Sequence, residues 1–197
     1  MAYELHIYRN EELESVLSDV IQFLTETPVL RLGEVETFLG SGVYLLYYTG
    51  DLEAYGELPE GSPIYTGKAV PRGWRQARTV EAEGSVLYLH LREHLRSIER
   101  ADNLDVADFR CRFVIMYGVA ADLVSAVENA LIRRYHPPWN SVIDGFGNHD
   151  PGSGRYDQAP SEWDTLHPGR PWVARLSGEA PDVGQIQAEL QEALKRH

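Results

Sequence analysis

The sequence predicts an α+β domain in which a small sheet is flanked by helices. Residues 42–49 and 109–117 are rich in β-branched and aromatic side chains, which is typical of strands. Residues 11–26, 85–100 and 121–135 instead repeat apolar side chains at helical spacing. The chain has 197 residues and no internal repeat, so it suits one domain of ordinary size.

The first predicted helix is Glu11–Glu26. Asn10 can cap its N-terminus, the acidic first turn suits the positive end of the helix dipole, and Pro28 stops the helix. The apolar side chains that recur at helical spacing are predicted to be buried: Leu13, Val16, Leu17, Val20, Ile21 and Leu24. We expect this helix to serve packing rather than chemistry.

Three strands are predicted. In the strand over 42–49, side chains alternate between faces, so Tyr44 and Val43 lie on opposite sides of the sheet. A long, acidic, turn-rich connection leads to a second strand over 63–67, and the two strands form a hairpin. Residues 109–117 supply the third strand.

Two further helices carry polar side chains at informative positions. In the helix over 85–100, His90 and His94 lie one turn apart on a flank of the apolar row, while Arg92 points nearly the opposite way. Paired histidines invite a zinc interpretation. No cysteine, and no carboxylate at the spacing of a metal motif, accompanies them, so zinc ranks low. The second helix covers 121–135.

The tail begins with a glycine-rich stretch and closes with an amphipathic helix. The apolar side of this helix consists of Val183, Ile186, Leu190 and Leu194. It could pack within its own chain or against a second subunit.

The composition limits the classes of protein to which the chain can belong. With 43% hydrophobic and 24% charged residues, the chain resembles a soluble globular protein. No run of about 18 apolar residues is present to span a membrane, and the N-terminus does not resemble a secretory signal. The only cysteine, Cys111, cannot form an intrachain disulfide and is predicted to be a buried structural thiol. Together these features predict a cytoplasmic protein.

The charge distribution favours a nucleic-acid partner although the net charge of −12 does not. Residues 1–64 hold 2 basic and 12 acidic side chains, residues 65–100 hold 7 and 4, and residues 101–197 hold 9 and 14. The basic surplus begins at Tyr65, as a site that binds phosphate requires. The alternative is a solvated face with scattered arginines.

Glu128 is the most informative carboxylate. On a helical wheel it lies between Val124 and Ile132, inside the apolar face. Burial of an unpaired carboxylate is costly, so Glu128 is predicted to have a partner. A metal ion, with Mg²⁺ the best fit, and a structural arginine are equally open alternatives.

Tyr44 and Tyr65 could be ordinary strand aromatics or could place hydroxyl groups in a site. A free phenol has a pKa near ~10, so it acts as a base only if a cation lowers that pKa, and Lys68 is the candidate cation. Gly42 and Gly67 leave room for backbone or phosphate to approach closely, or relieve a bend. Asn140 could close a turn, but we predict that its amide bonds a tyrosine hydroxyl or the backbone and so supports the site.

These motifs together resemble the GIY-YIG nuclease superfamily. The residues that carry the resemblance are Gly42-Val43-Tyr44, Tyr65-Thr66-Gly67-Lys68-Ala69, His94, Glu128 and Asn140. The Gly-Lys-Ala-Val-Pro continuation and the tail are similar to one branch of type II restriction endonucleases, which are dimers that cut a short GC-rich palindrome. The resemblance covers a core of about residues 42–140 within a single domain over 1–197. Residues 1–41 are then an N-terminal helical addition and residues 141–197 a C-terminal extension.

The resemblance implies a central three-stranded antiparallel sheet flanked by helices, and hydrolysis of phosphodiester bonds that depends on a single Mg²⁺, with Mn²⁺ as an alternative ion. Glu128 would hold the metal. Tyr44, helped by His94 or Lys68, would position or deprotonate the attacking water, and Tyr65 would orient the phosphate.

One position departs from the family pattern. The family places an arginine one turn before the histidine of its first catalytic helix, and here that position is His90. Arg92 faces the other way and cannot simply replace it. The phosphate contact then falls to a protonated His90 or to an arginine between residues 72 and 78, or the chain is catalytically impaired.

The predicted partner is double-stranded DNA, with no membrane. Cutting a palindrome requires two symmetric copies, so we expect a homodimer. The residues predicted to contact DNA are basic or amide side chains: Arg72, Arg75, Arg78, Asn148, His149, Arg155 and Arg170. Two alternatives remain open: a structure-specific repair or recombination nuclease, and a silent DNA-binding module, which the histidine at position 90 motivates.

Overall fold

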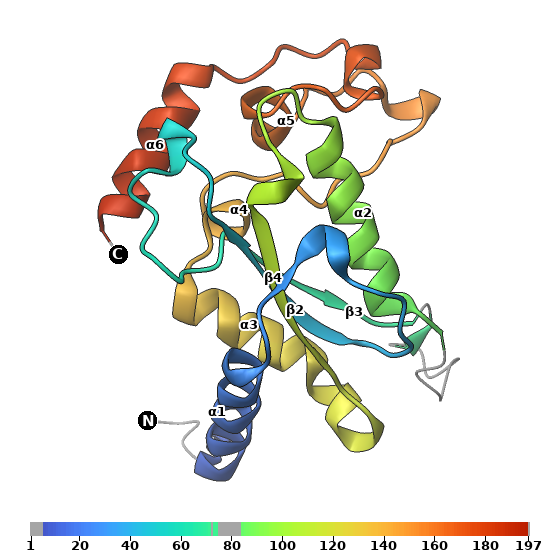
Figure 1. Ribbon diagram of the computed structural model, residues 1–197, viewed down its shortest axis with the longest axis vertical. Coiled ribbons are helices and arrows are strands. Elements are labelled where there is room, and N and C mark those ends of the chain that lie inside the picture. Colours follow the sequence, from blue (N-terminus) through green and yellow to red (C-terminus); the bar gives the residue numbers. More distant parts are fainter. Residues whose placement is uncertain (1–5, 72, 75–83, 197) are drawn as a thin grey trace.

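A computed structural model of the chain describes residues 6–71, 73–74 and 84–196, and these form an α+β fold, as predicted (Figure 1). Within this part, the sheet has four strands in the order β1–β4–β2–β3, and every neighbouring pair is antiparallel. The strands are β1 (Leu30–Arg31), β2 (Gly42–Tyr48), β3 (Tyr65–Ala69) and β4 (Phe109–Ile115).

The prediction of three strands is therefore wrong by one. The additional strand, β1, has two residues and pairs Leu30 with Cys111 of β4. Such a short strand shows no alternation in the sequence. The second predicted strand, 63–67, also lies two residues early, because pairing with β2 continues as far as Ala69.

The helices lie close to their predicted positions. In the described residues the α-helices are α1 (Glu11–Glu26), α2 (Val86–Arg100), α3 (Val124–Tyr135), α4 (Pro138–Ser141), α5 (Glu162–Leu166) and α6 (Val183–Lys195). Short 3-10 turns are η2 (Leu32–Glu34), η3 (Glu53–Tyr55), η5 (Val106–Asp108), η6 (Gly118–Leu123), η7 (Ser153–Arg155) and η8 (Val173–Arg175). None of these helices has both the length and the apolar character needed to cross a bilayer.

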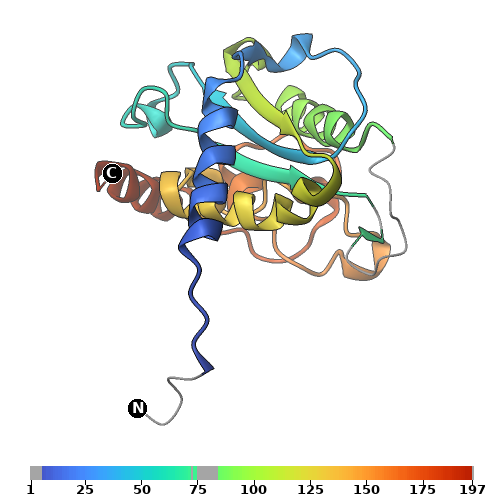
Figure 2. The ribbon, with the colours of Figure 1, turned by 90° about the horizontal axis from the view of Figure 1, so that it is seen from below.

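Helix α1 has the predicted bounds but is only partly covered. The side chain of Asn10 caps it by accepting a hydrogen bond from the Leu13 N–H at 3.2 Å. Ile21 and Leu24 are buried against the sheet, whereas Leu13 is 43% exposed. The predicted burial of the whole apolar stripe is therefore wrong, because the first turns of α1 extend beyond the sheet (Figure 2).

The sheet separates two apolar cores, as the alternation in β2 predicts. Tyr44 and Leu46 lie in the core formed with α2, α4, α5 and α6. Val43 and Leu45 lie in the core formed with α1 and α3. Cys111 is fully buried in the first core, which confirms the prediction of a buried thiol.

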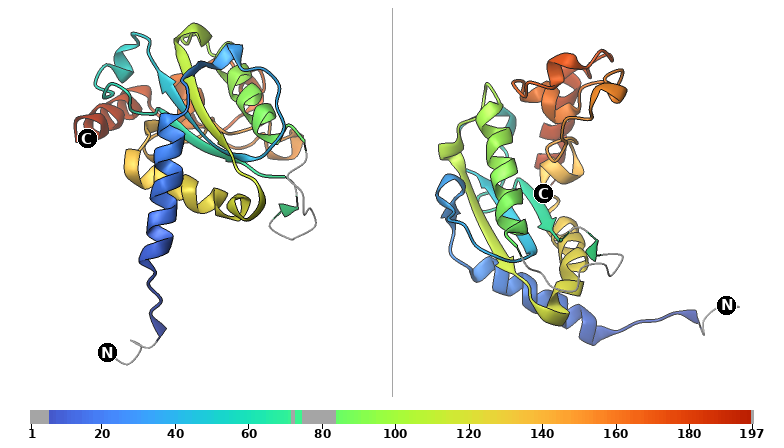
Figure 3. Two further views of the ribbon diagram at one scale, coloured as in Figure 1. Left: turned by 60° about the horizontal axis from the view of Figure 1, so that its bottom comes forward. Right: turned by 90° about the vertical axis from the view of Figure 1, so that its right-hand side faces the viewer.

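The C-terminal extension gathers at one end of the molecule, away from α1 (Figures 1 and 3). Helix α6 packs within its own chain, where Ile186, Leu190 and Leu194 are buried against α5 and η3. Val183, by contrast, is 43% exposed. Of the two packing alternatives for this helix, the structure shows the first.

Candidate active site

The sheet register brings the candidate residues to one edge of the sheet. In the β2–β3 ladder Tyr44 lies opposite Gly67, and Val43 lies opposite Lys68. Residues directly opposite each other share a face, and alternate residues along a strand do too. Tyr44 and Tyr65 therefore lie on the α2 side of the sheet and Lys68 on the α3 side. Because β3 is the edge strand, both sets meet around the same edge.

A cavity of about 250 Å³ lies at this edge. Its lining residues are Tyr44, Tyr65, Lys68, His90, Glu93, His94, Ser97, Glu128, Phe146, Gly147, Asn148 and His149. Residues from β2, β3, α2 and α3 are thus brought together with a segment of the C-terminal extension.

Tyr44 and His94 form a buried pair within the cavity. The Tyr44 hydroxyl lies 2.5 Å from His94 Nε2, and the two side chains are 1% and 7% exposed. Burial lowers the pKa of His94 to about 3, so the imidazole is neutral near pH 7. In the tautomer with its proton on Nδ1, this neutral ring accepts the hydrogen of the Tyr44 hydroxyl.

Gly67 makes room for the Tyr44 ring. A Cβ atom at Gly67 would lie 2.2 Å from the Tyr44 hydroxyl oxygen and 2.3 Å from Cζ. The prediction that glycine admits backbone or phosphate is therefore wrong for Gly67, because the tyrosine opposite it in the ladder occupies that space. It is confirmed for Gly42, where a Cβ would lie 1.9 Å from the backbone carbonyl oxygen of Val114.

Lys68 and Glu128 form an ion pair across the edge of the sheet. The Lys68 ammonium donates a hydrogen bond to Glu128 Oε2, and the side chains are 21% and 14% exposed. Glu128 has the partner that its position predicted. That partner is a lysine from the neighbouring strand rather than an arginine.

The pKa values of Tyr44 and Tyr65 are raised, whereas the sequence analysis named Lys68 as a cation that could lower them. Burial, followed by neighbouring charges, raises the pKa of Tyr44 well above its usual value. Burial and the charge of Glu128 raise the pKa of Tyr65 to about 12. Lys68 does not lower either pKa, because its ammonium group faces Glu128.

Asn140 supports the edge strand. Its side-chain oxygen accepts a hydrogen bond from the Thr66 N–H at 2.7 Å, and its amide donates to the Thr66 carbonyl at 2.8 Å. The side chain thus takes the place of a neighbouring strand at the open edge of β3. Of the predicted partners, the backbone is found and a tyrosine hydroxyl is not.

His90, at the position on α2 where the family has an arginine, lines the cavity. Burial lowers the pKa of His90, so its ring is neutral at pH 7 in the protein without DNA. The phosphate contact by a protonated His90 stays a prediction, because a phosphate beside the ring would itself favour the charged form. The predicted arginines at 72, 75 and 78 lie outside the described residues.

The family comparison covers most of the chain. The model of the Eco29kI GIY-YIG domain matches residues 36–194. The chain belongs to the Eco29kI GIY-YIG family. This is a family of type II restriction endonuclease domains, so the chain is a nuclease with DNA as its substrate. GIY-YIG nucleases generally use a divalent metal ion. A comparison with curated proteins gives no match.

Phe146 is a residue of this GIY-YIG site that the sequence analysis missed. Its ring stacks on His94, with centroids 4.5 Å apart and planes at 18°, and meets Tyr65 edge-on at 4.8 Å. The available signal was an aromatic residue between two glycines, Gly145 and Gly147, in an otherwise polar stretch.

The predicted DNA contacts of the extension fall into three environments. Asn148 and His149 line the cavity, and His149 Nε2 lies 3.9 Å from Glu93 Oε2. Arg155 is exposed on η7. Arg170 is 3% exposed, and its guanidinium binds groups of its own chain, so the prediction that it reads bases is wrong.

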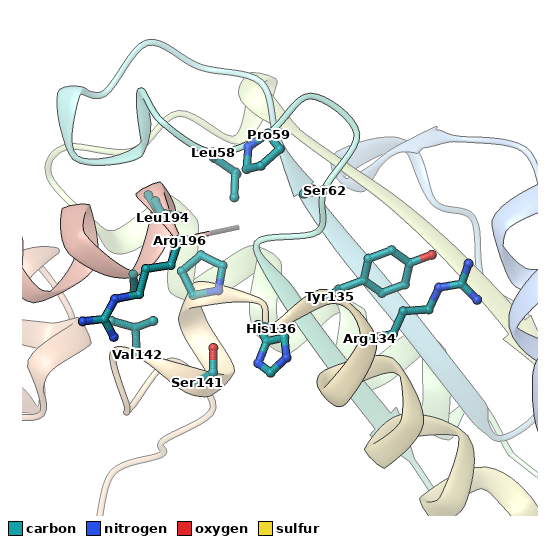
Figure 4. Close-up of a pocket in the computed structure, with 12 residues that line it drawn as sticks. Leu58, Pro59, Ser62, Arg134, Tyr135, His136, Ser141, Val142, Leu194 and Arg196 are labelled. Atoms are coloured by element: carbon teal, nitrogen blue, oxygen red, sulfur yellow. The ribbon is translucent and has the colours of Figure 1, made fainter.

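A second cavity, of about 340 Å³, lies away from the GIY-YIG site, between the β2–β3 connection, the C-terminal end of α3, α4 and α6 (Figure 4). Arg134 and Arg196 lie on opposite sides of it and do not point toward each other. None of the predicted site residues lines it.

Proposed function

We propose that the chain is a site-specific endonuclease that cuts double-stranded DNA as a homodimer and depends on Mg²⁺. The observation that carries this proposal is the convergence of two pairs, Tyr44–His94 and Lys68–Glu128, on one cavity at the β3 edge. The Tyr44–His94 pair can accept a proton, and the Lys68–Glu128 pair holds a carboxylate that can bind a cation.

Glu128 is the residue that fits the metal. Its carboxylate is largely buried, and its partner is a single ammonium group, which a divalent ion could replace. Within the described residues, no group of three or more His, Cys, Asp or Glu side chains could hold an ion. An ion at Glu128 would therefore take its other ligands from water and phosphate, which suits Mg²⁺. When bound, it supplies stabilisation of the negative charge that develops on the phosphate.

Tyr44 and His94 provide a route for the proton of the attacking water. The water oxygen bonds to phosphorus as the bond to the leaving sugar oxygen breaks. The water proton passes to the Tyr44 oxygen, the Tyr44 proton passes to His94 Nε2, and the leaving oxygen takes a proton from solvent. His94 is neutral near pH 7 and so has a free lone pair, but the burial that lowers its pKa also makes it a weak base in the protein without DNA. The transfer therefore depends on the negative charge that gathers on the phosphate, which favours the imidazolium.

Lys68 and Tyr65 would bind the phosphate. If a cation were bound at Glu128, the Lys68 ammonium would no longer be paired with that carboxylate and could contact a phosphate oxygen. The Tyr65 hydroxyl, on the other side of the same strand, can donate a hydrogen bond to another.

The homodimer follows from the need to cut two strands. The described part of each chain offers one such cavity, and a double-strand cut at a palindrome needs two in symmetric positions. Sedimentation velocity of the protein, alone and with DNA, tests this point: a species of twice the chain mass is expected.

Fragment-end sequencing tests the proposal as a whole. The protein is incubated with a long DNA and Mg²⁺, and all fragment ends are sequenced. Ends that share one short palindrome are expected. Cleavage at junctions irrespective of sequence would instead identify a structure-specific nuclease.

A second candidate, a catalytically impaired member of the family that binds DNA but cuts it poorly, is motivated by the histidine at the family's arginine position. His90→Arg separates this candidate from a silent binding module. An impaired nuclease should gain cleavage from this change, whereas a silent binding module should remain inert.

A further inference from the structure

The C-terminal extension forms part of the cavity wall. Phe146, Gly147, Asn148 and His149 line the cavity beside the residues of the core. Phe146 is 1% exposed and touches two of the proposed functional rings, and a Cβ at Gly147 would lie 3.4 Å from the hydroxyl of Tyr65. The position of this loop therefore decides the shape of the site.

Arg170 binds the backbone of the loop 145–148. Its guanidinium donates hydrogen bonds to the carbonyl oxygens of Gly145 at 2.8 Å, Phe146 at 3.1 Å and Asn148 at 2.9 Å. Its Nε donates to Asp164 Oδ1 at 2.6 Å, and both side chains of this ion pair are 1% exposed. One rigid fork thus fixes the backbone on both sides of Phe146.

The arginine is itself fixed from several directions. Its guanidinium carbon lies 4.6 Å from the ring centroid of Trp163 and 5.0 Å from that of Trp172. The hydroxyl of Ser161 donates to the other carboxylate oxygen of Asp164 at 2.6 Å. The loop fits closely against this serine, because a Cβ at Gly145, where φ is +102°, would lie 2.0 Å from the Ser161 hydroxyl oxygen.

Stability alone does not account for this arrangement. A buried ion pair is often no more stabilising than apolar side chains of similar volume. A planar fork with donors in fixed directions supplies orientation, which neither an apolar residue nor a lysine can supply. The backbone that it orients carries the ring that stacks on His94.

We propose that Arg170 is a positioning residue for catalysis: it fixes the loop 145–148 so that Phe146 holds the His94 ring against the Tyr44 hydroxyl. This inference rests on the proposed nuclease function. It makes the C-terminal extension a part of the active site rather than an addition to a complete core.

Arg170→Lys tests the proposal, because it keeps the charge and removes the fork. A ring displacement of about 1 Å can cost on the order of 10²-fold in rate, so we expect a loss of that size in kcat. KM for DNA should change by a smaller factor than kcat, because Lys68 and Tyr65, the proposed phosphate contacts on β3, lie outside the displaced loop, although Asn148 and His149 lie on it. Arg175→Lys is the matched control: Arg175 also pairs with an aspartate of the extension, Asp150, but at the exposed surface, at 3.0 Å. It should keep kcat within about twofold.

A second variant and a second measurement cover the case in which Arg170→Lys does not fold. Phe146→Leu keeps the guanidinium and its hydrogen bonds to the loop, but removes the stacked ring, and the same selective loss in kcat is expected. The NMR signals of the His94 ring, recorded without DNA, should be shifted by the ring current of Phe146 in the wild type. That shift should be lost in Phe146→Leu and altered in Arg170→Lys.

The outcomes separate the two proposals. If the wild-type protein does not cut DNA, the proposed function fails, whatever the NMR signals show. If the wild type cuts, and the variants that fold keep its kcat and its His94 signals, the positioning role of Arg170 is overturned.

Discussion

Replacing Gly67 with alanine tests whether the Tyr44 ring must cross β3 to reach His94. The added Cβ would lie 2.2 Å from the Tyr44 hydroxyl oxygen, and ordinary contact begins at 3.4 Å, so the two must separate by about 1.2 Å. Strand β2 is paired on both sides, so we expect the ring to move rather than the backbone. A movement of this size is enough to break the 2.5 Å contact with His94.

Two energetic costs set the expected loss in the free energy of unfolding. Overpacking of a buried position costs about 1–3 kcal/mol, and leaving a buried polar group unpaired costs about 1–3 kcal/mol more. We therefore expect Gly67→Ala to lower the free energy of unfolding by roughly 2–6 kcal/mol. A misplacement of about 1 Å in the proton acceptor should lower the cleavage rate on the order of 10²-fold.

Urea unfolding and single-turnover cleavage of a plasmid measure these two effects. Gly56→Ala is the control, because its φ is −59° and a Cβ there would have as its nearest neighbour the Glu53 carbonyl oxygen, at 3.4 Å. It should change stability by less than about 1 kcal/mol and leave cleavage intact. The reasoning is refuted if Gly67→Ala cuts DNA at the wild-type rate with wild-type stability.

Three further predictions concern stability and reactivity. Asn140→Ala removes both bonds to the Thr66 backbone and should cost about 2–3 kcal/mol in urea unfolding; a loss below about 0.5 kcal/mol would contradict the supporting role. Burial lowers the pKa of both His94 and His167 to about 3, so below pH 6.5 the unfolded chain binds protons that the folded chain does not. The free energy of unfolding should therefore be greatest above pH 6.5 and fall toward pH 5, by on the order of 2 kcal/mol for each histidine. A free energy of unfolding that stays flat or rises on acidification would be inconsistent with two neutral buried rings. Burial raises the pKa of Cys111 to about 12, so a thiol reagent at pH 8 should label it only on unfolding, and rapid labelling of the native protein would contradict its burial.

The parts of the fold that could be predicted from the sequence are those set by local pattern. Helix α1 has a capping asparagine, an acidic first turn and a terminating proline, and its bounds match the prediction. The alternation in β2 correctly assigned Tyr44 and Val43 to opposite faces. Strand β1 could not be found, because two residues show no period and its pairing with β4 is a long-range contact.

The parts of the site that could not be predicted depend on tertiary contacts. The partner of Glu128 is decided by the β2–β3 register, which turns Lys68 toward α3, and the sequence does not fix that register. Arg170 looks like any exposed arginine in the sequence. Its role appears only when the loop carbonyls of residues 145–148 fold onto it.

The most direct test of the central claim is the cleavage of DNA by Glu128→Gln in the presence of Mg²⁺. Glutamine keeps the size of the side chain and removes its charge, so a metal held by Glu128 should be lost. Glu192→Gln, which removes an exposed carboxylate on α6, is the control. We predict that Glu128→Gln abolishes Mg²⁺-dependent cleavage while DNA is still bound with a Kd within about threefold of the wild type. Cleavage by Glu128→Gln at the wild-type rate would contradict the metal role and, with it, the proposed active site.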